Sequence, residues 1–219
     1  MRFKPRAILW DLDGTIVDSN ACHLYTWESV LKTHGYRIDR GIYTENFGRK
    51  SSALLTALLG FEPEQDLMLE LIGEKERLYQ KIAADWITLI PGVLTWLEEA
   101  QVLNISQAIA SSAPIGNITT VLEIMNLGRF FEVIVPGTDL PAKPHPDIFL
   151  HAARSLDVPP QDCLVIEDAI SGVEGAYQAG MPCIAVSTTH TPEELQQADL
   201  IIKDFNVPFV ETLKKLNLN

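Results

Sequence analysis

Two aspartates separated by one residue, Asp11 and Asp13, follow directly on the apolar run Ala7–Trp10. The run has the length and composition of a buried strand, and alternate residues of a strand point to the same side. Both carboxylates can therefore face one site while Leu12 turns into the core. Gly14 then lets the chain leave the strand along a tight path. Because ligands of open α/β sheets bind at strand tips, this pair is the first candidate site.

Two carboxylates this close repel each other, by roughly 4 kcal/mol at a separation of ~4 Å and an effective dielectric constant of about 20. The pair therefore requires a proton or a cation. Mg²⁺ prefers carboxylate and phosphate oxygens, so it is the natural cation for this pair. An Asp-x-Asp pair can also simply begin a turn and cap a helix, so the interpretation needs support from the rest of the chain.

Hydroxyl groups follow a second predicted strand. Ser111 and Ser112 come directly after the apolar stretch 105–110 and precede a helix expected to begin at Pro114. Hydroxyls and free backbone N–H groups at a helix N-terminus bind anions. Serine is also a common helix cap, so these two residues support a phosphate site only together with other groups.

A lysine and a second acidic pair complete the set. Lys143 lies in the string Lys-Pro-His-Pro, whose prolines restrict the backbone. Its compact ammonium can hold a phosphoryl group and offset a carboxylate, although a solvated loop lysine is the simpler alternative. Glu167 and Asp168 directly follow the apolar stretch 163–166. Acids at that position suit a hard cation, with helix capping as the alternative.

The elements that must position these groups fall into two kinds. Between residues 19 and 84 only helical patterns occur, at about 19–34, 39–47, 51–59 and 63–84. After Pro91 helices alternate with strands, which predicts an α/β fold with a Rossmann-like parallel sheet and an inserted all-helical cap domain. The expected helices there are 93–101, 114–126, 146–156, 171–179 and 192–197, and the expected strands are 105–110, 131–135, 163–166, 183–186 and 200–202.

Composition limits the possible partners. The length of 219 residues fits one domain with a substantial insertion, and the net charge of −12 argues against nucleic acid. No apolar run approaches the ~18 residues of a membrane span. The three cysteines, Cys22, Cys163 and Cys183, lack metal-ligand spacing and are expected to be buried thiols. We expect a cytoplasmic protein with no nucleic-acid or membrane partner.

The string from Ile8 to Ser19 resembles the first motif of the haloacid dehalogenase (HAD) superfamily of phosphohydrolases. The order Asp-x-Asp, Ser, Lys, Glu-Asp matches the four motifs of that superfamily over nearly the whole chain. The strings Lys-Pro-His-Pro-Asp-Ile-Phe and Glu-Asp-Ala-Ile-Ser-Gly-Val-Glu-Gly-Ala resemble the subfamily that contains β-phosphoglucomutase and small sugar phosphatases. The resemblance implies a catalytic core of residues 1–17 and 88–219 and a C1-type helical cap of residues 18–87.

The resemblance also implies a reaction. Asp11 would be the nucleophile that forms an aspartyl-phosphate, and Asp13 would be the general acid and base. The implied Mg²⁺ ligands are Asp11, the backbone carbonyl of Asp13, Asp168 and, assisting, Glu167; the implied phosphate-binding residues are Ser111, Ser112 and Lys143. The substrate would be a small phosphorylated metabolite.

The expected cap contributes substrate contacts. His23 and Trp27 lie four residues apart on one helix face and match the mutase pattern, as does Lys75 with Tyr79. A packed cap helix and a solvated lysine are the simpler alternatives for the two pairs. The cap residues expected to contact substrate are His23, Trp27, Arg49, Lys50 and Lys75.

One register difference favours a phosphatase over a mutase. In β-phosphoglucomutase an arginine three residues after a cap glycine holds a second phosphate, whereas here the position three residues after Gly48 is Ser51. Arg49 and Lys50 follow the glycine directly. We therefore expect hydrolysis of a sugar-phosphate-like monoester, with Arg49 or Lys50 at its polar end. A phosphosugar mutase, or a non-catalytic phosphate-binding or phospho-accepting module, remain the alternatives.

Overall fold

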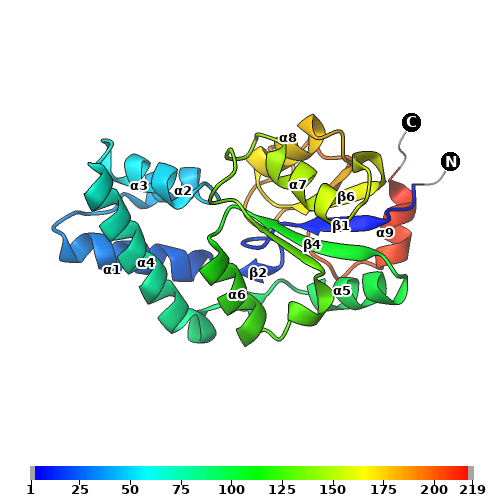
Figure 1. Cartoon of the computed structure of the whole chain (residues 1–219), viewed down its shortest axis with the longest axis horizontal. Helices are drawn as coiled ribbons and strands as arrows, with labels where there is room; N and C mark the ends of the chain where they lie inside the picture. Colours follow the sequence, from blue (N-terminus) through cyan, green and yellow to red (C-terminus); the bar gives the residue numbers. More distant parts are fainter. Residues whose placement is uncertain (1–2, 217–219) are drawn as a thin grey trace.

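The computed structural model describes residues 3–216 and contains a six-stranded parallel sheet flanked by helices (Figure 1). Trp10 of the central strand pairs with Ile109 on one side and Ile166 on the other. The Rossmann-like parallel sheet expected from the sequence is confirmed. In spatial order the strands are β5 (Val133–Pro136), β4 (Ser106–Ser111), β1 (Ala7–Trp10), β6 (Cys163–Glu167), β7 (Cys183–Val186) and β8 (Leu200–Ile202).

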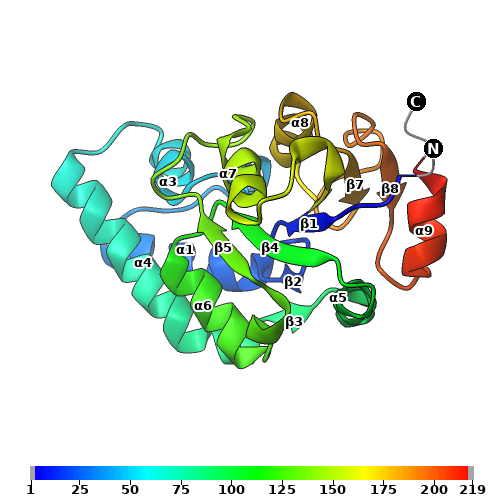
Figure 2. The same cartoon turned by 45° about the vertical axis from the view of Figure 1, so that its right-hand side comes forward.

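Both faces of the central strand β1 are covered, which explains its uninterrupted apolar sequence. Ile8 and Trp10 belong to one hydrophobic cluster, and Ala7 and Leu9 belong to another on the opposite face. Fully burying a side chain such as Ile8 or Leu9 contributes about 1.5–3 kcal/mol. The helices on the first face are α5 (Val93–Val102), α6 (Ile115–Ile124) and α9 (Phe209–Lys215), and those on the second are α7 (Asp147–Ser155) and α8 (Ile170–Gln178) (Figure 2).

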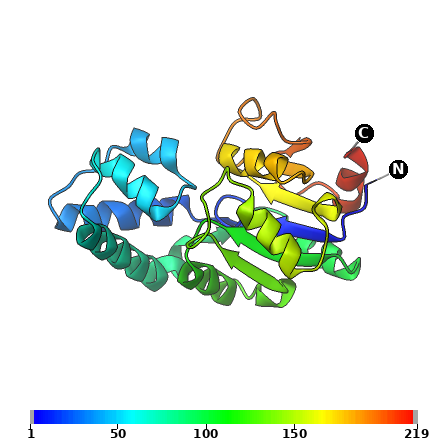
Figure 3. The ribbon, with the colours of Figure 1, turned by 45° about the horizontal axis from the view of Figure 1, so that its top comes forward.

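Four helices between β1 and α5 form a separate layer at the carboxyl end of the sheet, here called the helical insertion (Figure 3). They enclose their own hydrophobic cluster, which includes Trp27, Tyr43 and Leu55. The chain enters and leaves the insertion through a two-stranded antiparallel ribbon of β2 (Val17–Asp18) and β3 (Thr88–Leu89). The helices are α1 (Asn20–Thr33), α2 (Arg40–Asn46), α3 (Ser51–Leu59) and α4 (Gln65–Trp86).

The expected helix at 192–197 is wrong. The structure has turns there, because Leu195 N–H donates to Thr191 C=O but the next bond, from Ala198 N–H to Leu195 C=O, closes only a three-residue turn. A single turn does not recover the cost of helix nucleation. The sequence analysis also missed α9 and the β2–β3 ribbon, which are short elements defined by tertiary contacts. Two 3₁₀ turns cover Gly128–Phe130 (η1) and Pro160–Asp162 (η2).

Within residues 3–216, no helix combines the length and the apolar character needed to cross a membrane. Residues 1, 2 and 217–219, which belong to the ends of the expected catalytic core, lie outside the described residues.

Candidate active site

The polar groups predicted from the sequence meet at one edge of the sheet. Asp11 directly follows β1, while Ser111 and Glu167 are the last residues of β4 and β6. Parallel strands bring their carboxyl ends to the same edge. A cavity opens there between the sheet and the helical insertion, and its walls include Asp11, Asp13, Ser111 and Ser112.

Lys143 is not a solvated loop lysine. Its ammonium donates to Asp11 Oδ1 and Glu167 Oε1, each at 2.6 Å, and to the carbonyl of Ala110 at 3.0 Å. The side chain is only 5% exposed. Burial alone would lower the pKa of Lys143, but Asp11 and Glu167 raise it above its usual range. A permanent positive charge therefore lies against the Asp11 carboxylate.

Three buried acids form a cluster that includes both carboxylate partners of this lysine. Asp11, Glu167 and Asp168 each offer a carboxylate oxygen, and these oxygens lie within 4.8 Å of one another. Burial raises the pKa of Asp11 to about 7, despite the lowering effect of Lys143. Burial, together with the charges of Glu167 and Asp11, raises the pKa of Asp168 well above its usual range. Three acids against one ammonium leave an excess of negative charge that a divalent cation would balance.

Hydrogen bonds fix two of these carboxylates in place. Thr15 Oγ1 donates to Asp168 Oδ1 at 2.9 Å, and Thr189 Oγ1 donates to Asp168 Oδ2. Glu167 Oε2 accepts from the N–H groups of Asp168 and Ala169. The sequence analysis missed Thr15 and Thr189. Thr189 follows the end of β7, so the strand-end signal that identified the acids also applied to it.

Two glycines give the acids their room. A Cβ at Gly14, whose φ is +91°, would lie 2.2 Å from Asp168 Oδ2. A Cβ at Gly172 would lie 1.9 Å from the Glu167 carboxylate. Any larger residue would displace these oxygens. The chain thus builds a fixed set of hard oxygen ligands, and this set fits Mg²⁺.

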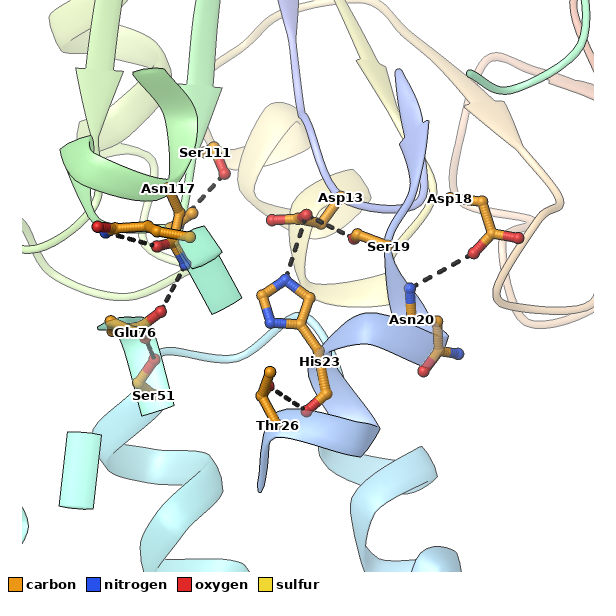
Figure 4. A network of polar contacts seen from close by, with 12 residues as sticks. Asp13, Asp18, Ser19, Asn20, His23, Thr26, Ser51, Glu76, Ser111 and Asn117 are labelled. Atoms are coloured by element: carbon orange, nitrogen blue, oxygen red, sulfur yellow. Dashed lines mark hydrogen bonds and ion pairs between the residues drawn. The ribbon is translucent and has the colours of Figure 1, made fainter. Parts of the chain in front are cut away.

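The Asp13 carboxylate points toward Ser19 and toward His23 of the helical insertion (Figure 4). It accepts from Ser19 Oγ at 2.6 Å and lies 3.3 Å from His23 Nε2. Ser19 is the residue before α1, but its hydroxyl donates to Asp13 and does not cap the helix. The two aspartates therefore have separate partners, the Lys143 ammonium for Asp11 and the His23 ring, a hydrogen-bond donor, for Asp13.

A buried lysine fixes the orientation of His23. Lys75 Nζ lies 2.9 Å from His23 Nδ1, and an ammonium can only donate, so Nδ1 accepts and Nε2 carries the proton toward Asp13. The His23 ring stacks on Tyr79 with centroids 4.3 Å apart. Burial would raise the pKa of Asp13, but His23 and the Ser19 hydroxyl lower it below its usual range. Lys75 is 1% exposed, so the solvated-lysine alternative is wrong.

The remaining residues expected to contact substrate differ in position. Trp27 and Arg49 line the cavity, and Arg49 is exposed at its surface. Lys50 does not line it, because its ammonium donates to the carbonyls of Thr138 and Leu140. Lys50 therefore ties the helical insertion to the loop that precedes Lys143. Of the two residues expected at the polar end of a substrate, the structure brings only Arg49 to the cavity.

Comparison with known proteins agrees with this geometry. A family model for haloacid dehalogenase-like hydrolases matches residues 8–186. The β-phosphoglucomutase of Bacillus subtilis (strain 168) is 31% identical over 206 residues, which cover 90% of this chain and 89% of that protein. Validoxylamine A 7′-phosphate phosphatase of Streptomyces hygroscopicus subsp. limoneus is 26% identical over 202 residues, with 91% and 93% covered.

A solved structure extends the similarity to three dimensions. The crystal structure of a CbbY variant from Rhodobacter sphaeroides in complex with xylulose 1,5-bisphosphate has a TM-score of 0.85. It is 26% identical in sequence, and the match covers 92% of this chain and 95% of that one.

Proposed function

Because the chain belongs to the haloacid dehalogenase-like hydrolases, we propose that it is an Mg²⁺-dependent phosphatase that hydrolyses a sugar-phosphate-like monoester through an aspartyl-phosphate on Asp11. The observation that carries the proposal is the contact between Asp11 and Lys143 beside the buried acids Glu167 and Asp168. This arrangement supplies a nucleophile, a fixed cation and a metal-ligand set at one point.

The reaction begins with charge neutralisation. A phosphate ester is anionic and repels a carboxylate, so Lys143 offsets the charge at Asp11 before attack. Asp11, the Asp13 carbonyl, Asp168 and Glu167 would hold Mg²⁺, which when bound supplies further positive charge at the phosphoryl oxygens. The residues proposed to hold the transferring group itself are Ser111, Ser112 and Lys143.

Two displacements then follow. An Asp11 oxygen attacks phosphorus, and the bond from phosphorus to the leaving oxygen breaks. In the free protein His23 and Ser19 lower the pKa of Asp13, but the anionic phosphoryl group of a bound substrate raises it and favours the protonated acid. Asp13 then gives its proton to that oxygen. Water next attacks the phosphorus of the aspartyl-phosphate and loses a proton to Asp13, which releases phosphate and restores Asp11. The Ser19 and His23 contacts hold the Asp13 carboxylate at the side of the cavity where the leaving group lies.

We propose that the helical insertion, residues 18–87, is the cap that closes over the core formed by residues 1–17 and 88–219. His23, Trp27 and Lys75 reach the cavity from α1 and α4. Lys50 stabilises the closed arrangement through its bonds to the core. Closure excludes bulk water, which strengthens the electrostatic contacts within the site.

The metal requirement gives a direct test of the activity. Phosphate release from phenyl phosphate should be measured with Mg²⁺, after chelation with EDTA, and after Mg²⁺ is restored. We expect chelation to lower the rate at least about 100-fold, because the excess negative charge of the acids then repels the substrate. Full activity in EDTA would contradict the metal assignment. Absence of phosphate release from phenyl phosphate and from a metabolite panel would favour a binding module.

A phosphosugar mutase is the second candidate, favoured by the similarity to the Bacillus subtilis enzyme. A mutase must hold two phosphate groups and protect its aspartyl-phosphate from water. Only one phosphate-binding site, the one formed around Lys143, is well supported here. We expect incubation with β-glucose 1-phosphate and a trace of the 1,6-bisphosphate to yield free phosphate. Rapid formation of glucose 6-phosphate with little free phosphate would reverse the assignment.

A further inference from the structure

A third acid faces the cavity without a part in the proposed chemistry. Glu76 lies on α4, and its side chain is 12% exposed. Ser51 Oγ donates to its Oε1 at 2.8 Å, and Asn117 Nδ2 donates to its Oε2 (Figure 4). Lys75 Nζ also donates to Oε2, at 3.1 Å. These partners belong to α3, α4 and α6. The carboxylate is therefore fixed where the helical insertion meets the sheet domain.

The surroundings of Glu76 suit hydroxyl groups. A carboxylate accepts about four hydrogen bonds, and the three protein donors leave Oε1 able to accept from a ligand. The hydroxyls of Ser51 and Ser112 also line the cavity, and each can donate or accept. A sugar or polyol presents several O–H groups that match such acceptors.

The same surroundings do not suit a second phosphate. Lys75 is paired with Glu76 and hydrogen-bonded to His23, and His23 contacts Asp13. Among the described residues that line the cavity, Arg49 is the one cationic side chain without an ion pair. A second phosphate near Glu76 would meet a fixed like charge and would leave the carboxylate without its hydroxyl donor.

We propose that Glu76 is a specificity residue that selects a monophosphate whose leaving group is an uncharged sugar or polyol and rejects a sugar bisphosphate. This inference rests on the phosphatase activity proposed above and adds the class of leaving group. Glu76 acts on the part of the substrate that lies away from the phosphoryl group attacked by Asp11.

The test compares three substrates: phenyl phosphate, fructose 6-phosphate and fructose 1,6-bisphosphate. In the unaltered protein we expect kcat/KM for the monophosphate of fructose to exceed that for the bisphosphate at least about tenfold, equivalent to ~1.4 kcal/mol. Glu76→Gln removes the negative charge at nearly constant size. It should raise the ratio of bisphosphate to monophosphate kcat/KM at least about tenfold.

Glu74→Gln is the matched control, since Glu74 lies on the same helix but pairs with His34 away from the cavity. Its ratio of bisphosphate to monophosphate kcat/KM should equal that of the unaltered protein. The proposal is overturned if the unaltered protein accepts the bisphosphate as well as the monophosphate, a measurement that does not depend on any variant folding. An unchanged ratio in folded Glu76→Gln also overturns it. Phosphate release from phenyl phosphate in either case leaves the phosphatase assignment intact, whereas no release from any substrate overturns both.

Discussion

Replacing Asp11 by asparagine should abolish turnover and leave the fold intact. The amide cannot attack phosphorus, so no aspartyl-phosphate forms and the rate should fall by more than about 10³-fold. Asn Oδ1 can still accept from Lys143, and Glu167 still pairs with that ammonium, so the site keeps its contacts. Phosphate release from phenyl phosphate and circular dichroism together measure both outcomes.

A matched substitution separates loss of the nucleophile from a general effect of removing a carboxylate nearby. Asp18→Asn alters an exposed residue of β2 whose side chain accepts only from Asn20 N–H among the described contacts. Its activity should equal that of the unaltered protein. If Asp11→Asn keeps more than a few per cent of the activity, Asp11 is not the nucleophile and the proposed mechanism fails.

Replacing Asp13 by asparagine should lower the rate about 10²–10⁴-fold for a substrate with a poor leaving group such as a sugar. The asparagine Oδ1 can still accept hydrogen bonds from Ser19 and His23. Its amide cannot give a proton to the leaving oxygen. A nitrophenolate leaves without protonation. The rate of the first step, phosphoryl transfer to Asp11, should therefore fall less for p-nitrophenyl phosphate.

The informative quantity is the dependence of the loss on leaving-group pKa. Rates for a series of aryl and alkyl phosphates should be measured under single-turnover conditions, which isolate the transfer to Asp11 from later hydrolysis. A loss that grows with leaving-group pKa supports Asp13 as the general acid. An equal loss for every member of the series would remove Asp13 from that role.

The amino-acid sequence was sufficient for the sheet and for the groups at its edge. A continuous apolar run such as Ala7–Trp10 is stable only when both faces are buried, and polar residues directly after it must lie at the strand tip. The same reasoning placed Ser111 and Glu167, and the structure brings their strand ends together. It failed at residues 192–197, where a helix-like composition was too short to form one.

Tertiary structure alone decided how the charged side chains are paired. Lys143 lies 132 positions from Asp11, and Asn117 lies 41 positions from Glu76, yet each pair is in contact. Local periodicity cannot report such contacts. The first depends on how the segment before α7 packs against β1, and the second on how α4 of the insertion docks against α6.

The surroundings of individual side chains follow the same rule. A lysine such as Lys75 is usually a solvated surface residue. Here the docking of α1 against α4 buries it beside His23. Docking also takes Lys50 to backbone carbonyls of the core and leaves Arg49 at the cavity. Sequence thus determined which groups stand at the sheet edge, whereas packing between the two layers determined which charges neutralise one another and which remain for a substrate.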